Sequence, residues 1–319
     1  MRIVVTGGAG YIGSHVVHAL VAAGHEPIVL DDLSNGHADA VGTARLVRGD
    51  VCAPNTLGHL VEETRAEAIL HFAARIQVGE SVSRPDLYYN TNVGGMLQLV
   101  TVAAAHHLPV VFSSTAAVYG EPEIIPIPVT HPCRPESPYG ASKWMCERIL
   151  LDATHANQLR HVTLRYFNAA GANVEAGLGE HHHPETHLIP RAIDAARKRT
   201  PALTLFGTDW PTPDGTCIRD YIHVVDLADA HVRALEYLAQ KGASTTLNLG
   251  GGTGTTVRQI LNSVAKATGQ SVPHELAPRR PGDVASLVAD ITEAKRVLDW
   301  APKNSTIDQI VADAAALRP

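Results

Sequence analysis

The stretch that decides the fold is MRIVVTGGAGYIGSHVVHAL, residues 1–20, where a short apolar run leads directly into a glycine-rich segment. Gly7, Gly10 and Gly13 lie three residues apart, and an apolar helical pattern follows them. Glycine permits a tight turn and lets the backbone come close to a pyrophosphate, which the free N–H groups of a helix N-terminus can bind. The stretch therefore predicts a strand, a phosphate-binding turn and a helix.

A second apolar run, Ile28–Leu30, follows the helical pattern and ends at Asp31, eighteen residues after Gly13. Strand, helix and strand in about thirty residues form a β-α-β unit, which implies a parallel sheet. A carboxylate at the end of the second strand can bond the ribose of a dinucleotide, and it repels a 2′-phosphate. A glycine turn without a ligand does not account for Asp31, so we predict that NAD binds in preference to NADP.

Short apolar runs and helical patterns continue to alternate along the first half of the chain. The further predicted strands are Arg45–Val47, Ala68–Phe72, Val110–Ser114 and His161–Phe167, and the predicted helices are Thr56–Arg65, Asn90–His106 and one beginning near Tyr139. This alternation predicts an α/β fold with an open, doubly wound parallel sheet of the Rossmann type. We also expect a smaller C-terminal α/β domain that binds the substrate.

The predicted domain boundary follows from a change of composition after Asn168, where the chain becomes rich in Gly, His and Pro. We assign residues 1–168 to the NAD-binding domain, together with a returning segment at about 218–248 whose strand and helix rejoin the main sheet. Residues 169–217 and 249–319 then form the second domain. The GGGTG cluster at Gly250–Gly254 predicts a structural turn, because no acidic strand end follows it.

Composition excludes several classes of protein. The 319 residues carry a net charge of −6 with no basic patch, so no nucleic-acid partner is expected. No apolar run is long enough to cross a bilayer. Four cysteines without a CxxC pair favour a reduced, cytoplasmic protein. The segment EHHHPETH, Glu180–His187, lacks the HExxH spacing and contains Pro184, so we expect a substrate loop and no metal.

The segment SPYGASKWMCERIL, Ser137–Leu150, opens a predicted helix with Tyr139 and Lys143. Residues four apart lie on one face of a helix, one turn from each other. By spacing alone, such a pair is usually a surface contact. Its meaning depends on the rest of the chain.

The whole chain resembles the extended short-chain dehydrogenase/reductases, and within them the UDP-glucose (UDP-galactose) 4-epimerases. The segments that carry the resemblance, in family order, are TGGAGYIGSH, HFAA…VGESV, YYNTNV, SSTAAVYG, YGASK, RYFNAAGA, ETHLIP, DGTCIRDYIHVVDLA and RRPGDVASLVAD. The resemblance implies that Tyr139 and Lys143 are the YxxxK pair and that Thr115 completes the catalytic site. A free tyrosine has a pKa of about 10, so we expect Lys143 and the positive nicotinamide ring to favour the phenolate.

The same resemblance implies the remaining site residues. Those that match NAD-contacting positions, besides Tyr139 and Lys143, are Gly7, Gly10, Tyr11, Ile12, Gly13, Asp31, Asn35, Asp50, Val51, Phe72, Ala73, Ala74, Asn92 and Phe167. Those expected around the UDP-sugar, besides Thr115 and Tyr139, are Arg75, Asn168, His187, Leu188, Phe206, Arg219, Arg280, Asp283 and Leu287. Guanidinium groups such as Arg219 and Arg280 form paired hydrogen bonds with phosphate oxygens, although each could equally form an ordinary salt bridge.

The activity that the resemblance implies is inversion at C4 of a UDP-hexose, between UDP-glucose and UDP-galactose, through a transient 4-keto sugar. Two other classes stay open: a net NAD-dependent oxidoreductase and an NAD-binding regulator without catalysis. Retention of Tyr139, Lys143 and Thr115 argues against the regulator. Relatives commonly form homodimers through helices that correspond to Asn90–His106 and Tyr139–His155, so we expect a homodimer.

Three positions depart from the family pattern. Ile76 stands where many epimerases have a lysine near the NAD phosphates, and Arg75 lies beside it. Leu287 replaces a tyrosine found in epimerases restricted to plain hexoses. Leu287 leaves room at the sugar, and Arg75 could either replace the lysine or bind a carboxylate at C6. UDP-glucuronate 4-epimerase, with the same mechanism, is therefore the alternative function.

Overall fold

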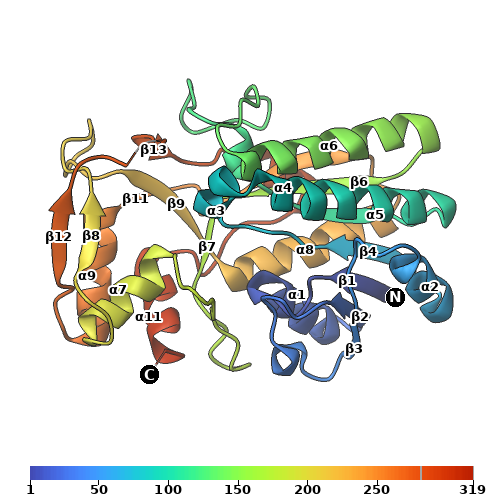
Figure 1. Ribbon diagram of the computed structural model, residues 1–319, viewed down its shortest axis with the longest axis horizontal. Helices are drawn as coiled ribbons and strands as arrows, with labels where there is room; N and C mark the ends of the chain where they lie inside the picture. Colours follow the sequence, from blue (N-terminus) through green and yellow to red (C-terminus); the bar gives the residue numbers. More distant parts are fainter. Residues whose placement is uncertain (281, 319) are drawn as a thin grey trace.

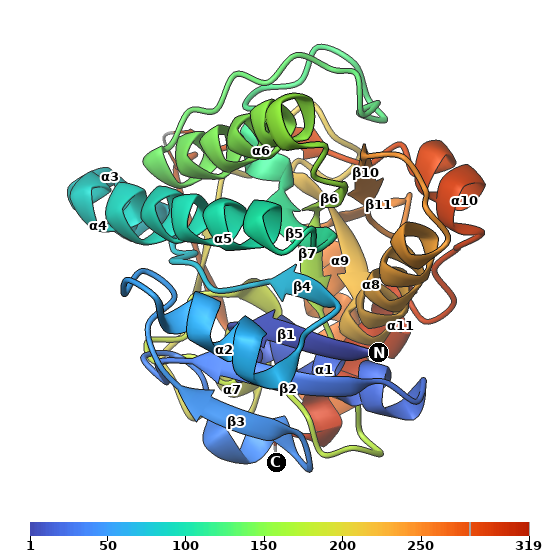
Figure 2. The ribbon, with the colours of Figure 1, turned by 90° about the vertical axis from the view of Figure 1, so that its right-hand side faces the viewer.

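The structure is a computed structural model that describes residues 1–280 and 282–318 (Figure 1). Its larger part is a seven-stranded parallel sheet in the order β10-β6-β5-β4-β1-β2-β3, which can be followed in Figure 2. Its strands are β1 (Arg2–Thr6), β2 (Glu26–Asp31), β3 (Arg45–Arg48), β4 (Ala68–His71), β5 (Val110–Thr115), β6 (His161–Tyr166) and β10 (Thr245–Leu249). Helices cover both faces, so the central strands are continuous apolar runs. The predicted doubly wound sheet is confirmed, with most strand ends within one residue of the prediction.

Two apolar clusters hold the helices against the two faces of this sheet. One face carries α1 (Tyr11–Ala22), α8 (Val224–Ala239) and α10 (Thr292–Leu298). The other carries α2 (Thr56–Thr64), α5 (Gly94–Ala105) and α6 (Pro138–Asn157), and Figure 2 shows α5 and α6 lying side by side. The predicted helix Asn90–His106 is more elaborate than expected: α3 (Val78–Ser83), α4 (Pro85–Tyr88) and a π-helical turn, η2 (Tyr89–Val93), precede α5.

The smaller part contains a four-stranded sheet and a two-stranded sheet packed against helices (Figure 1). The four strands are β7 (Asn168–Ala170), β9 (Ile218–His223), β11 (Gly254–Thr256) and β13 (Ser286–Leu287), and the two are β8 (Leu203–Phe206) and β12 (His274–Ala277). Helices α7 (Leu188–Ala196), α9 (Val257–Thr268) and α11 (Ile307–Ala316) share an apolar cluster here. Short 3-10 turns, η1 (Ala38–Val41) and η3 (Ala116–Val118), complete the elements.

One detail of the predicted returning segment was wrong. Helix α8 and strand β10 do rejoin the main sheet, but β9 does not: it pairs in parallel with β7 and β13 and antiparallel with β11. Strand β7 begins just after the end of β6 and leads the chain out of the main sheet. The chain therefore changes sheets at His223, directly before α8.

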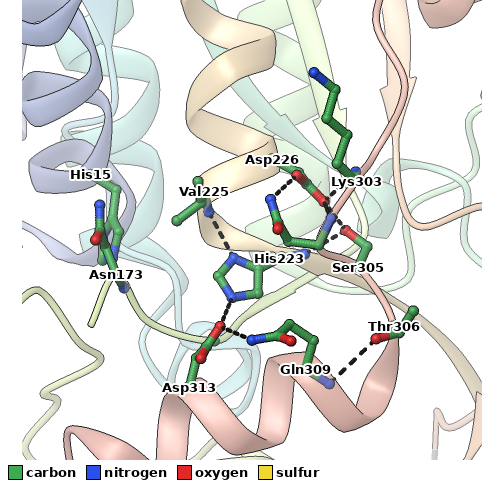
Figure 3. Close-up of polar contacts among 12 residues, drawn as sticks. His15, Asn173, His223, Val225, Asp226, Lys303, Ser305, Thr306, Gln309 and Asp313 are labelled. Atoms are coloured by element: carbon green, nitrogen blue, oxygen red, sulfur yellow. Dashed lines mark hydrogen bonds and ion pairs between the residues drawn. The ribbon is translucent and has the colours of Figure 1, made fainter. Parts of the chain in front are cut away.

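Polar contacts fasten the two parts together at this change of sheet (Figure 3). His223 Nε2 lies 3.1 Å from Asp313 Oδ2 of α11, and its Nδ1 accepts from the backbone N–H of Val225. Because Nδ1 is an acceptor, Nε2 carries the ring hydrogen and donates a hydrogen bond to the Asp313 carboxylate. Asp226 of α8 accepts hydrogen bonds from the Lys303 and Asn304 backbone, the Asn304 side chain and the Ser305 hydroxyl. The C-terminal segment is thereby fixed to α8.

The predicted turn at Gly250–Gly254 is confirmed as a structural one. Gly252 has a φ of +74°, which favours glycine. The buried Asp220 carboxylate accepts from the backbone N–H groups of Gly251, Gly252 and Ala289 at 2.7, 3.2 and 3.0 Å. Burial raises the pKa of Asp220 to about 6, and these hydrogen bonds oppose the rise. The Gly251 and Gly252 amides are thus occupied by an internal carboxylate and are not offered to a phosphate.

Within residues 1–280 and 282–318, no helix combines the length and the apolar character needed to cross a bilayer.

Candidate active site

The glycine-rich loop lies where the strand order reverses, between β1 and β4, the place where open α/β sheets bind ligands. Gly7 has a φ of +71°, and a Cβ there would lie 2.4 Å from the backbone nitrogen of Ala73. A Cβ on Gly13 would lie 2.2 Å from the Gly7 carbonyl oxygen. These two positions accept only glycine, because loop, β4 and α1 approach so closely. The backbone at the start of α1 therefore carries no side chains at Gly7 and Gly13 that would keep a ligand away from it.

Asp31 stands at the end of β2, as predicted, and it is buried beside this loop. Its Oδ2 accepts from the backbone N–H of Ala9 at 2.9 Å, and Oδ1 accepts from that of Leu33 at 2.9 Å. Burial raises the pKa of Asp31, while these two hydrogen bonds oppose the rise. The carboxylate therefore fixes the glycine loop against β2. The expected hydrogen bond from Asp31 to a ribose would be made in addition to these two backbone hydrogen bonds.

The other residues expected at the cofactor gather at the same edge of the main sheet, because they follow the carboxyl ends of parallel strands or begin α1. Tyr11 and Ile12 lie in the first turn of α1, Asn35 follows β2, Asp50 and Val51 follow β3, Phe72, Ala73 and Ala74 follow β4, and Phe167 follows β6. Asn92 differs from the rest. Its amide accepts from the Arg75 N–H and donates to the Arg75 carbonyl and to Ser142 Oγ, so both of its donors are engaged within the protein.

The residues expected to be catalytic meet at the start of α6 and the end of β5. Ser137 caps α6 by accepting from the Gly140 N–H at 3.1 Å, and this places Tyr139 in the first turn with Lys143 one turn later. Lys143 is buried, and its Nζ donates to the Ser113 carbonyl at 2.7 Å. Thr115, the last residue of β5, lies near enough to the Tyr139 hydroxyl to lower its pKa.

The electrostatics of this trio differ from the expectation for Tyr139. Burial raises the pKa of Tyr139, and the hydrogen bond to Thr115 only partly opposes the rise. Burial also lowers the pKa of Lys143, to about 8, while Cys146 and Glu147 act in the opposite direction. The Lys143 ammonium faces the Ser113 carbonyl. In the protein alone Tyr139 is therefore a neutral phenol at neutral pH. The effect of a bound, positively charged nicotinamide on the phenolate stays a prediction.

Four residues expected around the substrate meet in the smaller part although they come from three separate stretches of the sequence. Asp283 Oδ1 lies 2.9 Å from Nη2 of Arg280 and 3.7 Å from Nη2 of Arg219. The Arg280 guanidinium carbon lies 5.7 Å from the centre of the Phe206 ring. Arg219 also donates to the Ile218 and Val284 carbonyls at 2.8 and 2.9 Å. One carboxylate thus holds two guanidinium groups in place.

The remaining predicted substrate residues lie on neighbouring elements. Leu287 is paired with Arg219 between β13 and β9, and it packs against the apolar cluster that contains Ala116 and Phe167. Leu287 is half-buried against this cluster. Asn168 begins β7, while His187 and Leu188 lie at the start of α7.

Arg75 has a partner that the sequence did not indicate. Its Nη1 lies 3.6 Å from Oε2 of Glu80, and the Tyr88 hydroxyl donates to the same oxygen at 2.8 Å. The Tyr88 ring in turn meets the Tyr139 ring edge-on, with centroids 6.4 Å apart. An internal carboxylate already balances Arg75, so the reason for expecting a carboxylate on the sugar is weakened.

Sequence reasoning missed two sets of polar residues near the site. One is the buried ion pair between Glu147 of α6 and Arg165 of β6, which no local motif reveals. The other is a set of carboxylates and imidazoles within Glu180–His187, where only a substrate loop was expected.

Comparison with known proteins identifies the family. The model of the NAD dependent epimerase/dehydratase family matches residues 3–250. The UDP-glucose 4-epimerase of Rhizobium meliloti (strain 1021) is 50% identical over 303 residues, 95% of this chain and 92% of that protein. That of Azospirillum brasilense is 48% identical over 98% of this chain and 90% of the relative.

Solved structures agree with these relatives. The crystal structure of UDP-glucose 4-epimerase from Brucella ovis in complex with NAD superposes with a TM-score of 0.96, at 45% identity over 98% of this chain and 97% of that one. The enzyme from Bifidobacterium longum in complex with NAD⁺ and UDP gives 0.93, at 35% identity over 100% and 98%. The Rossmann-type sheet and the YxxxK helix are those of an extended short-chain dehydrogenase/reductase. Within that class, the chain belongs to the NAD dependent epimerase/dehydratase family.

Proposed function

We propose that the protein is a 4-epimerase of UDP-hexoses that interconverts UDP-glucose and UDP-galactose with NAD as its bound cofactor. The observation that carries the proposal is the meeting of Tyr139, Lys143 and Thr115 at the edge of a dinucleotide-binding sheet. Relatives with up to 50% identity over nearly the whole chain are UDP-glucose 4-epimerases. The backbone left bare by Gly7 and Gly13, together with the buried carboxylate of Asp31, fits a dinucleotide.

The residues of the chain divide the chemistry between proton transfer and positioning. Tyr139 takes the proton from the C4 hydroxyl and later returns it, with Thr115 holding the hydroxyl groups in register. Lys143 is fixed to the Ser113 carbonyl and supplies positive charge near the phenol. NAD, when bound, supplies the hydride acceptor and donor at C4. Inversion requires the 4-keto sugar to present its other face, so the hexose must be held loosely.

The nucleotide part of the substrate needs a firm hold, and the smaller part of the structure supplies cations for it. Arg219 and Arg280, oriented by Asp283, are suited to the two phosphates of UDP. We accordingly assign NAD binding to residues 1–168 with α8 and β10 of the segment that follows His223, and UDP-sugar binding to residues 169–217 and to most of the chain after β10. Strand β9 belongs with the second group by its pairing.

The side chains after Thr115 support a reaction that stops at C4. Related dehydratases and decarboxylases carry extra acids there, whereas this chain has Ala116 and Ala117. Two other classes compete with an epimerase: a net NAD-dependent oxidoreductase and an NAD-binding regulator without catalysis. An oxidoreductase consumes free NAD(H), and a regulator does not turn over.

We expect the purified protein to contain NAD and to convert UDP-galactose to UDP-glucose without stoichiometric addition of NAD. Each turnover regenerates the cofactor, because the hydride returns to the same carbon. Released nucleotide is measured after denaturation, and the sugar by coupled assay. Stoichiometric formation of NADH would instead identify an oxidoreductase, and tighter binding of NADP than of NAD would contradict the role given to Asp31.

Sugar preference is expected to depend on Leu287 more than on Arg75. Leu287 is expected to border the sugar, and tyrosine there is larger, so kcat/KM of Leu287→Tyr for UDP-N-acetylglucosamine should fall relative to that for UDP-glucose. Arg75→Ala should leave the ratio between UDP-glucuronate and UDP-glucose within about threefold, since Glu80 already neutralises Arg75. The values are measured for three substrates in three proteins. A glucuronate preference that collapses in Arg75→Ala would establish the alternative function.

We also propose that the protein is a cytoplasmic homodimer. The outward faces of α3, α5 and α6 carry large apolar side chains, namely Val78, Val82, Leu97, Trp144, Met145 and Leu151. An apolar patch of this kind marks an interaction surface. The four cysteines are free thiols, which suits a reducing compartment.

Replacing both Leu97 and Trp144 with glutamate is expected to convert the dimer to a monomer, because the charges would be buried without partners. Light scattering at fixed protein concentration measures the mass. Leu276→Glu is the matched control: this leucine is 63% exposed on β12, away from α5 and α6, and its loss should leave the dimer intact. If the wild-type protein is a monomer, the proposed homodimer is wrong.

A further inference from the structure

Four metal-ligating side chains meet in the segment between β7 and α7. Glu180, His182, Glu185 and His187 each offer one donor atom, and these atoms all lie within 4.8 Å of one another. His187 Nδ1 lies 2.7 Å from Glu180 Oε1 and 3.1 Å from Glu185 Oε1. His182 Nδ1 lies 3.3 Å from Glu180 Oε1 and 4.0 Å from Glu185 Oε2. The sequence spacing is not HExxH, which is why no metal was expected from it.

Two atoms of this set are buried without hydrogen-bond partners: His182 Nδ1 and Glu185 Oε2. They face each other, and the Glu185 side chain is only 10% exposed. The nearest cation to Glu185 Oε2 is Arg318 Nη1 at 3.6 Å, too far for a hydrogen bond. Buried polar atoms in native proteins almost always have partners, so an unpaired imidazole nitrogen opposite an unpaired carboxylate oxygen points to a missing ligand.

The donor set and its spacing suit a transition metal. Two imidazoles and two carboxylates form a mixed N/O set of the kind that Zn²⁺ binds, with bonds of about 2.0–2.2 Å. Tetrahedral ligands on such bonds lie roughly 3.4 Å apart, and the separations given above, from 2.7 to 4.0 Å, bracket this value. A dication would also balance the two carboxylates, whose side chains are 7% and 10% exposed.

The surroundings hold the donors in place. Arg318 pairs with Asp194 of α7 at 2.7 Å and approaches Glu185, while the Tyr11 ring meets the His182 ring edge-on with centroids 6.3 Å apart. Tyr11 begins α1, directly after the glycine loop, and its hydroxyl donates to the Gly171 carbonyl at 2.8 Å.

We propose that Glu180, His182, Glu185 and His187 bind one divalent transition metal ion of the Zn²⁺ class. The ion cross-links the 180–187 segment at the junction between α1 and α7. It is a structural ion whose ligands include none of Tyr139, Lys143 and Thr115; His187, which was expected around the UDP-sugar, is here assigned to the ion. This proposal replaces the expectation of no metal, and it does not depend on the identity of the sugar substrate.

The test is metal binding by untagged protein that has been freed of metals with a chelator. Titration with Co²⁺, followed by its visible absorption, and with Zn²⁺, followed by calorimetry, should give one saturable site per chain. His182→Ala and Glu185→Gln should each weaken binding at least about tenfold. His183→Asn is the matched control, because this exposed histidine lies in the same segment outside the set and should bind like wild type.

Circular dichroism and NAD content confirm that each variant is folded. Saturating Zn²⁺ should raise the melting temperature of wild type and of His183→Asn, but not of His182→Ala or Glu185→Gln. Absence of saturable binding in wild type overturns the proposal. So does binding that His182→Ala and Glu185→Gln leave unchanged, or that His183→Asn abolishes, since surface histidines would then account for it.

Discussion

Replacing Tyr139 with phenylalanine is expected to lower kcat at least about a hundredfold while the fold and the NAD content stay unchanged. The substitution removes only the phenolic oxygen, which lies near Thr115 and is proposed to carry the C4 proton. The ring and its edge-on contact with Tyr88 remain. Initial rates of UDP-galactose conversion, with cofactor released from the same samples, measure the two effects separately.

Tyr88→Phe is the matched control for this experiment. It removes the phenolic oxygen of Tyr88, a buried neighbour of Tyr139. The Tyr88 hydroxyl donates to Glu80 and has no proposed part in the chemistry, so kcat should change by no more than a few fold. Near-normal activity of Tyr139→Phe would remove Tyr139 from the proposed chemistry. Equal losses in both variants would assign the effect to packing.

Replacing Glu147 with alanine is expected to lower the free energy of unfolding by about 3–5 kcal/mol, the usual cost of leaving a buried charge without its partner. Glu147 on α6 pairs with Arg165 on β6 at 2.7 Å, and both side chains are 9% exposed. Burial opposes charge on Arg165, but the hydrogen bonds and charge of Glu147 outweigh it and raise the pKa of the guanidinium. Urea unfolding measures the change.

Asp152→Ala provides the control on the same helix. Asp152 pairs with Arg148 at 3.0 Å, but both side chains are largely exposed, so the cost should be at most about 0.5 kcal/mol. Because Glu147 lies one turn after Lys143, its loss should also disturb Lys143 and reduce kcat. Equal stability of the two variants would show that the Glu147 pair contributes no more than a surface contact.

The main sheet could be predicted from sequence because its signals are local. Gly7, Gly13 and Asp31 sit at fixed offsets around one strand and one helix, and the buried strands are plain apolar runs. Strand β9 was misplaced because nothing within Ile218–His223 says which sheet it joins. That choice depends on β7, β11 and β13, which are distant in sequence.

In the candidate site, too, residues close in the sequence could be placed together, whereas residues joined only by tertiary structure could not. Tyr139 and Lys143 lie on one helix, so their spacing alone placed them together. Arg219 and Asp283 meet only through tertiary structure, and resemblance to a family was the sole way to nominate both. For Glu180–His187 the sequence favoured a substrate loop over a metal, because the HExxH pattern was absent; the proposed metal ligands lie in an irregular segment that this pattern does not describe.

The route of the chain between its sheets affects how new specificities can be made. After β6 the backbone leaves the main sheet for β7, returns for α8 and β10, leaves again for β11, and comes back for α10 before it ends in α11. The smaller part of the structure is therefore not a unit that recombination or cloning could transplant at a single junction. A chimera would need several matched splices at once. We expect new sugar preferences to arise by point substitution within an intact chain, at positions such as Leu287.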